Sequence, residues 1–179
     1  RVDRRQRQMC IRDRRWAWDG VVFEVLHPLP GDDAPGAAKP PRPNALSCVL
    51  RISAAGTEGA SALLVGDIEA PQEQALLARG APVQADLLLV PHHGSKTSSS
   101  AAFLEAVQPR TALVQAGYRN RFGHPAPDVL QRYRARQIAV VESSRCGAAR
   151  WSSSQPRQVA CERDTGEHYW QHRMVPRDD

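Results

Sequence analysis

Residues 86 to 98 constrain the fold more than any other stretch, because an apolar strand-like run ends there abruptly in polar residues. Pro91 ends the strand by withholding a backbone N–H, and Gly94 permits a turn that a side chain would hinder. Side chains at such a strand end project into a fixed, accessible space. An ordinary polar loop is the simpler interpretation, but two adjacent imidazoles, His92 and His93, favour a functional site.

The composition is that of one globular domain. The chain has 179 residues, of which 41% are hydrophobic, and this is enough to bury a core. No run approaches the roughly 18 apolar residues of a membrane span, and the N-terminus is too charged for a signal peptide, so we expect a soluble segment. The four cysteines form no C-x-x-C pair, which argues against a zinc ribbon. Cys146 and Cys161 could form a disulfide.

The net charge of +5 is concentrated in an N-terminal arm. Residues 1–15 carry seven Arg and two Asp, a local charge of +5, so the rest of the chain sums to zero. A basic stripe across the domain is therefore not supported. The arm has no helical or strand periodicity. It is either a flexible tail that binds nucleic acid or foreign sequence, from a fusion or a read-end error.

Strand-like and helical segments alternate along the chain, which predicts an α/β domain over residues 16–165. Trp16 and Trp18 are expected to pack near the first strand, and residues 166–179 form a tail. In that tail, His168 and His172 are predicted to be surface residues. Apolar runs predict strands over residues 21–26, 47–53, 61–66, 86–91, 111–116 and 138–142. Helices are predicted over residues 71–79, 99–107 and 127–136, and a hairpin over 148–152 and 158–162.

Asp67 is the second candidate, because it follows an apolar strand and Gly66. Carboxylate and imidazole are common ligands of Zn²⁺ and Mn²⁺, and α/β sheets gather ligands at the carboxyl ends of their strands. The alternative is a tight turn before the next helix. Glu69, two residues further on, is expected at the start of that helix.

The third candidate is the loop of residues 117–125, which contains His124, Arg119 and Arg121. Guanidinium and imidazole groups beside a metal suit a phosphodiester, because they can clamp its oxygens and assist the leaving group. The alternative for the arginines is a solvated loop. For His124 the alternative is a hydrogen bond that anchors the turn before Pro125.

The order of these motifs resembles a known family. Residues 44–50 are followed by Leu-Val-Gly-Asp-Ile-Glu, then by Ala-Asp-Leu-Leu-Leu-Val-Pro-His-His-Gly-Ser, then by residues 120–125. This order is similar to the C-terminal half of the metallo-β-lactamase-like domain of ComEC-type competence proteins, over about residues 20–145. The resemblance implies an αββα sandwich.

The resemblance also implies a site. Asp67 and His92 match metal ligands, with Zn²⁺ or Mn²⁺ as the divalent metal. The other implied roles are catalytic for His93 and His124, and substrate-binding for Ser95, Asn120 and Arg121. The family's early His-x-His-x-Asp-His loop is absent, and Asn44 stands where its middle His is expected; His27 is the only imidazole nearby. We therefore expect this chain to be a fragment that binds metal weakly and is inactive alone.

The resemblance implies metal-dependent hydrolysis of a DNA phosphodiester, on a single strand or the non-transported strand, during DNA uptake. No small organic cofactor is implied. The full-length protein would lie in the bacterial inner membrane with its own channel region, and this segment on one face of the membrane. Recognition through backbone charge is expected, because no aromatic-rich stacking platform is evident. Two alternatives are a noncatalytic DNA-binding or guiding module with a degenerate metal site, and a hydrolase of a small phosphoester or thioester.

Overall fold

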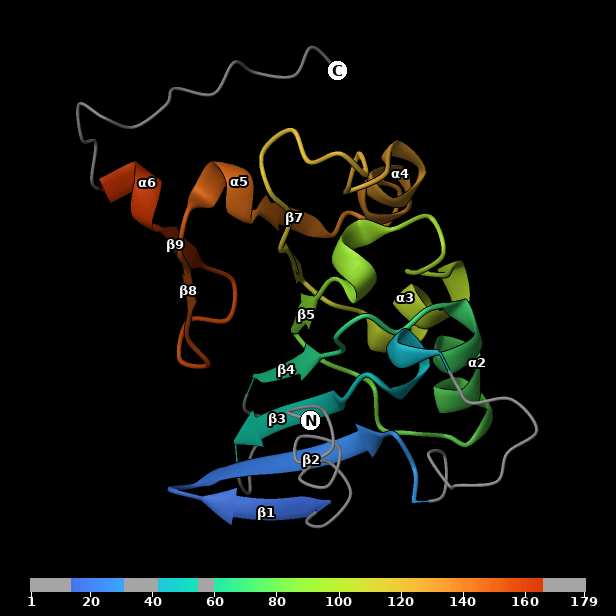
Figure 1. The fold of residues 1–179 in the computed structure, drawn as a ribbon. Helices are drawn as coiled ribbons and strands as arrows, with labels where there is room; N and C mark the ends of the chain where they lie inside the picture. The colour runs from blue at the N-terminus through green and yellow to red at the C-terminus, as the bar shows by residue number, and fades with distance from the viewer. Residues whose placement is uncertain (1–13, 31–41, 55–59, 166–179) are drawn as a thin grey trace, which may run out of the picture.

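A computed structural model of the chain describes residues 14–30, 42–54 and 60–165. Its centre is a seven-stranded sheet in the order β1-β2-β3-β4-β5-β6-β7 (Figure 1). The pairs from β1 to β4 are antiparallel, and the pairs from β4 to β7 are parallel. The strands are β1 (Arg15–Trp18), β2 (Val21–His27), β3 (Val49–Ala54), β4 (Ser61–Leu64), β5 (Leu87–Leu89), β6 (Thr111–Val114) and β7 (Ala139–Glu142). The predicted mixed α/β class is confirmed.

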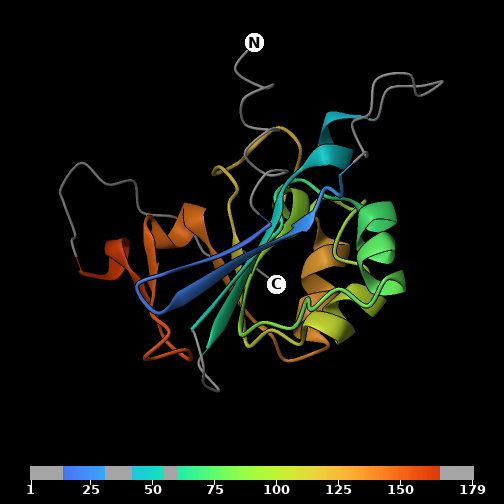
Figure 2. The same cartoon turned by 90° about the horizontal axis from the view of Figure 1, so that it is seen from below.

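Three helices cover one face of this sheet (Figure 2): α2 (Ala70–Ala78), α3 (Ala101–Val107) and α4 (Pro127–Arg134). Each connects two adjacent parallel strands, and because such crossovers are right-handed, successive helices fall on the same side. The core lies between the helices and the sheet. Its fully buried members include Leu63, Leu76, Leu88, Phe103, Ala112 and Tyr133.

The other face of the sheet is also apolar. Because side chains alternate across a pleated strand, one row of register partners points away from the helices. This row is Leu50, Leu64, Leu89, Leu113 and Val141. All five are only half-buried, whereas Leu63 and Leu88, on the helix-covered face, are fully buried. A sheet that is apolar on both faces is typical of one that is covered on both sides.

A small unit follows β7. The predicted hairpin is confirmed as β8 (Ala149–Trp151) and β9 (Val159–Cys161), which form a separate two-stranded sheet. The short helices α5 (Ser143–Cys146) and α6 (Glu162–Thr165) flank it. The disulfide that the sequence allowed joins Cys146 to Cys161.

The predicted strands and helices all form, but several of their ends are wrong. The strands predicted to end at residues 66, 91 and 116 end two residues earlier, because the chain turns there into loops. Trp16 and Trp18 form β1, a strand that was not predicted, and its first residue, Arg15, belongs to the predicted arm. Two short 3-10 helices, η1 (Pro43–Leu46) and η2 (Pro91–Gly94), were also missed. Residues 1–13 and the whole tail, with His168 and His172, lie outside the described residues. Among the helices that the structure describes, none has the length and apolarity to span a membrane.

Glu73 is a buried carboxylate that ties α2 to α3. Its two oxygens accept hydrogen bonds from the backbone N–H groups of Ser99 (2.6 Å) and Ser100 (2.8 Å), where Ser100 is the N-cap of α3. The Ser99 hydroxyl lies 3.1 Å from the hydroxyl of Tyr133, and burial raises the pKa of this tyrosine. A negative charge near the positive end of a helix is also favourable. Glu73 therefore holds the segment between η2 and α3 in place.

We predict that Glu73→Gln destabilises the chain by about 2 to 3 kcal/mol, because a charged double acceptor is replaced by a neutral side chain with one acceptor. Urea denaturation followed by circular dichroism measures this free energy of unfolding. Glu105→Gln, on the exposed face of α3, is the matched control and should change it by less than about 0.5 kcal/mol. Equal stability of the two variants would contradict the assignment.

Candidate functional site

The candidate site lies at one edge of the sheet. β4, β5 and β6 are parallel, so their carboxyl ends share this edge, where α/β sheets usually bind ligands. The loops after these strands carry the predicted residues Asp67, His92, His93 and His124. β3 is antiparallel to β4, so η1, which precedes β3, brings Asn44 to the same edge.

The backbone of η2 directs the two adjacent imidazoles differently. His92 (φ 47°, ψ 42°) and His93 (φ 57°, ψ 18°) both adopt left-handed conformations, which non-glycine residues rarely do. The loop is tied to the end of β4, because the N–H of His92 donates to the carbonyl of Gly66 at 3.0 Å. Such backbone strain clusters at functional sites.

His93 faces Asp67. Its Nδ1–H donates to the carbonyl of Gln115 at 2.7 Å, and its Nε2 lies 3.4 Å from Oδ1 of Asp67. In a neutral imidazole with this tautomer, Nε2 is an acceptor and faces a second acceptor. Two acceptor atoms at this distance repel each other. A proton on Nε2 of His93, or a cation bound by both Nε2 and the Asp67 carboxylate, would remove this repulsion. A backbone carbonyl that orients one ring nitrogen is also the usual outer contact of a metal-binding histidine.

His92 faces Glu69. Its Nδ1 lies 3.2 Å from Oε1 of Glu69, although not in hydrogen-bond alignment, and its Nε2 lies 3.4 Å from the amide nitrogen of Asn44. Thr97 also donates its hydroxyl to Glu69, at 3.1 Å. The ring of His92 is 6.1 Å from that of His124, whose buried Nδ1 has no hydrogen-bond partner among the described residues.

The structure adds pairings that the sequence prediction did not specify. Asp67, a predicted metal ligand together with His92, lies beside His93, and its role as a ligand stays a prediction. Glu69, expected only at a helix start, is indeed the N-cap of α2 and is also the carboxylate next to His92. The Asp-x-Glu spacing was the available signal, because two carboxylates in one turn can reach two neighbouring imidazoles.

Of the residues predicted to bind substrate, Arg121 is exposed, Asn120 is half-buried and Ser95 is buried. Ser95 is buried and lies 3.1 Å from the hydroxyl of Thr97. Asn120 uses its side chain within its own loop, where its Oδ1 accepts from the N–H of His124. Their contact with substrate stays a prediction. His27 is buried, and its Nε2–H donates to the carbonyl of Ala45 at 2.8 Å.

The donors at this edge have the right chemistry for a divalent metal, but they are not a full ligand set. A carboxylate and an imidazole face each other across 3.4 Å, and two more imidazole nitrogens nearby lack aligned partners. Within the described ranges, however, no group of three or more His, Cys, Asp or Glu residues is arranged to hold a metal ion. The Asp67–His93 pair therefore fits a cation as part of a site.

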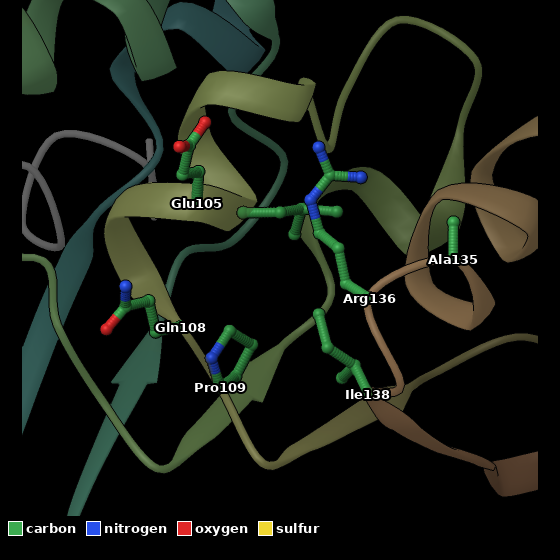
Figure 3. Close-up of a pocket in the computed structure, with 7 residues that line it drawn as sticks. Glu105, Gln108, Pro109, Ala135, Arg136 and Ile138 are labelled. Carbon is green, nitrogen blue, oxygen red and sulfur yellow. The ribbon is translucent and has the colours of Figure 1, made fainter.

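A pocket elsewhere in the fold is separate from this edge. The pocket is lined by residues at the end of α3 and just after α4 (Figure 3). Because α3 leads into β6 and α4 leads into β7, the pocket lies at the amino ends of these two strands. The candidate site is at their opposite, carboxyl ends. The pocket is lined by Leu104, Glu105, Gln108, Pro109, Ala135, Arg136 and Ile138.

Gly94 brings two of the site loops into contact. Its φ is +81°, and a Cβ at this position would lie 2.6 Å from Cβ and 3.0 Å from Cα of Pro125. Its carbonyl also accepts from the N–H of Ala126 at 2.9 Å. The absence of a side chain therefore lets the loop with His92 pack against the loop with His124.

We predict that Gly94→Ala destabilises the chain by about 2 to 4 kcal/mol, because strain at positive φ and a clash with backbone add together. The control is Gly80→Ala, where φ is +65° but no atom lies within 4 Å of the new Cβ. Without the clash it should cost only about 1 kcal/mol. Urea denaturation gives both values, and similar losses would mean that the close approach to Pro125 is unimportant.

The pKa of His124 is lowered, first by burial and then by the nearby imidazoles of His92 and His93. A histidine with a lowered pKa binds fewer protons in the folded than in the unfolded state. Its contribution to stability is therefore complete above the unfolded-state pKa and is lost as the pH falls through the folded-state pKa.

We predict that an NMR titration of the full chain gives His124 a midpoint below that of a histidine in an unfolded peptide. In His92→Gln, which removes one neighbouring positive charge, the midpoint should move upward. A midpoint at or above the peptide value would contradict the assigned burial. The C2–H signal of His124 is identified by its loss in His124→Gln.

The fold and the edge define a class: a mixed α/β domain with imidazoles and carboxylates at the carboxyl ends of parallel strands. No protein-family model matches the chain. Competence protein ComA of Neisseria gonorrhoeae is 36% identical over 160 residues, which cover 89% of this chain and 22% of that protein. Recombination protein 2 of Haemophilus influenzae is 31% identical over 169 residues, 94% of this chain and 20% of that protein. ComE operon protein 3 of Bacillus subtilis is 36% identical over 118 residues, 66% of this chain and 15% of that protein.

The chain is therefore homologous to ComEC-type competence proteins over most of its length. It spans about a fifth of the length of the curated relatives that it matches. The recognition made from the order of the sequence motifs is thereby confirmed.

Proposed function

We propose that this chain is part of a metallo-β-lactamase-like domain that hydrolyses DNA phosphodiesters in a DNA-uptake protein. The observation that carries the proposal is the pairing of Asp67 with His93, beside Glu69 and His92, at the carboxyl edge of the parallel strands. Homology to competence proteins supports DNA as the substrate.

The proposed fold is one half of an αββα sandwich. A layer of helices on one face of the sheet and an apolar row on the other are the two surfaces that such a half requires. The row of Leu50, Leu64, Leu89, Leu113 and Val141 would then pack against a second sheet. Burial of an aliphatic side chain contributes about 1.5 to 3 kcal/mol, so covering this face stabilises the domain substantially.

The residues at this edge would have different roles in the reaction. Asp67 and His93 would hold a divalent cation, Zn²⁺ or Mn²⁺, and His92 would be oriented beside it by Glu69 and Asn44. When bound, such an ion supplies Lewis-acid stabilisation and a water of lowered pKa. His124 would move a proton at its Nδ1, which is buried and has no hydrogen-bond partner within the described ranges.

The surroundings of this domain are also proposals. The resemblance to ComEC-type proteins implies a membrane channel region in the same protein, which is the proposed partner. The relatives are several times longer than the chain, which leaves room for such a region. The proposed location is one face of the bacterial inner membrane. The single or non-transported DNA strand is the proposed substrate.

A noncatalytic DNA-binding or guiding module is the second candidate. It is favoured by one observation: among the described residues, none form a group of three or more ligands. Assays of DNA binding and DNA cleavage separate the two candidates. A guiding module binds DNA whether or not a metal is present, but it does not cleave the DNA.

We predict that Mn²⁺, added to the full chain, broadens the NMR signals of His93 and Asp67 first, because a paramagnetic ion relaxes the nuclei that it contacts. Asp67→Asn should weaken this binding by about tenfold or more. The control is Asp128→Asn, an exposed carboxylate on α4, 4.0 Å from Lys96. Broadening spread equally over all surface carboxylates would exclude a site at this edge.

We also predict that the full-length protein loses metal-dependent DNA cleavage, by about 100-fold or more, in Asp67→Ala, His92→Ala or His93→Ala. Release of a labelled nucleotide from single-stranded and duplex DNA measures the rate, with Asp128→Asn as the control. Undiminished cleavage in any of the three variants would refute the role of that residue. Retained DNA binding with no cleavage by the unchanged protein would favour the guiding module.

A further inference from the structure

The loop between β6 and α4 exposes two aromatic rings beside the candidate site. Phe122 is 66% exposed and Tyr118 is 39% exposed, although large apolar side chains are usually buried. They lie in the segment Gly-Tyr-Arg-Asn-Arg-Phe-Gly, which interleaves the rings with two arginines. The sequence alone predicted no stacking platform, because these aromatics are few and separated.

The rings of this loop are arranged for stacking. The ring of Phe122 is stacked with that of His124, with centroids 5.8 Å apart and an interplanar angle of 18°. The guanidinium of Arg121 lies 4.7 Å from the centroid of Phe122, and that of Arg119 lies 5.2 Å from the centroid of Tyr118. Phe122 and Arg121 thus form a surface that continues through His124 into the imidazole cluster, and Tyr118 and Arg119 form a second pair in the same loop.

Internal hydrogen bonds keep this loop in shape. The side chain of Asn120 donates to the carbonyl oxygens of Gly117 (3.0 Å) and His124 (2.6 Å). It also accepts from the N–H of His124 at 3.0 Å. These hydrogen bonds hold the loop in the conformation that exposes Phe122. An aromatic ring on a rigid loop loses little conformational entropy when it binds a flat ligand.

We propose that residues 118–122 bind unpaired nucleobases of single-stranded DNA, with Phe122 as the stacking ring and Arg119 and Arg121 as contacts to the phosphates. This proposal rests on the proposed function and adds the loop and the side chains that bind its substrate. Aromatic rings stack on bases that have left the duplex, and stacking tolerates any sequence. The two positive charges match the DNA backbone, and His124 would set the bound strand next to Asp67 and His93.

The experiment measures fluorescence anisotropy of labelled 12-nucleotide probes with the full chain in EDTA, so that neither metal binding nor cleavage is needed. The probes are oligothymidylate, an abasic strand of equal length, and a hairpin duplex. We expect the chain to bind oligothymidylate more tightly than either of the other probes. The abasic strand reports the charge contribution, including that of the N-terminal arm.

Phe122→Ala should weaken oligothymidylate binding about tenfold and abasic binding less than twofold, and Phe122→Trp should restore it. Arg121→Ala should weaken both and reduce the salt slope by about one. The control is Trp18→Ala, because Trp18 is 74% exposed but belongs to β1, at the far side of the sheet. Circular dichroism verifies the fold of each variant.

Equal losses for oligothymidylate and the abasic strand in Phe122→Ala, or no loss, would overturn the proposal. Absence of binding to every probe would also overturn it and would leave the loop as a contact for a protein. Because the assay excludes metal, base-dependent binding would stand even if the full-length protein did not cleave DNA. The failure of the proposed function and of this inference are therefore distinguishable.

Discussion

The parallel pairing of β4, β5 and β6 is the constraint on which the site depends. Its register aligns Leu64 with Leu89 and Leu89 with Leu113, so β4 and β5 end level and β6 ends one residue further on, at the same edge. A shift of one residue in this register would move every side chain of a strand to the opposite face of the sheet. Because both faces are apolar, the hydrophobic pattern alone would not prevent such a shift. The helices that connect the strands fix the direction of each strand, and the loops that follow them converge as a result.

Two buried contacts hold those loops in place. Glu73 binds the backbone that leads from η2 into α3, and Gly94 lets η2 pack on Pro125. These contacts offset the strain of the left-handed residues His92 and His93, which costs about 1 to 3 kcal/mol for each residue. The imidazoles are thus positioned by contacts that lie outside the cluster of imidazoles and carboxylates.

Much of the fold could be predicted from apolar runs, glycines and prolines, because these report local backbone preference. The ends of the strands could not, since hydrophobic residues such as Val65 and Val90 continue past the ladder into the core. β1 was missed because its short Trp-Ala-Trp run adjoins an arginine-rich arm and its pairing is set by β2. The burial of Glu73 was also invisible, because its partners lie 26 and 27 residues away in the sequence.

The sequence by itself determined most of the groups at the candidate site, although not Glu69, and the order in which the chain supplies them, because motif order and strand ends are local properties. It therefore sufficed to recognise homology to ComEC-type competence proteins. Only the tertiary structure decided the partners: Asp67 with His93, Glu69 with His92, and Phe122 stacked on His124. Those pairings depend on how the loop backbones turn after each strand, and the turns are set by contacts between segments that are distant in sequence.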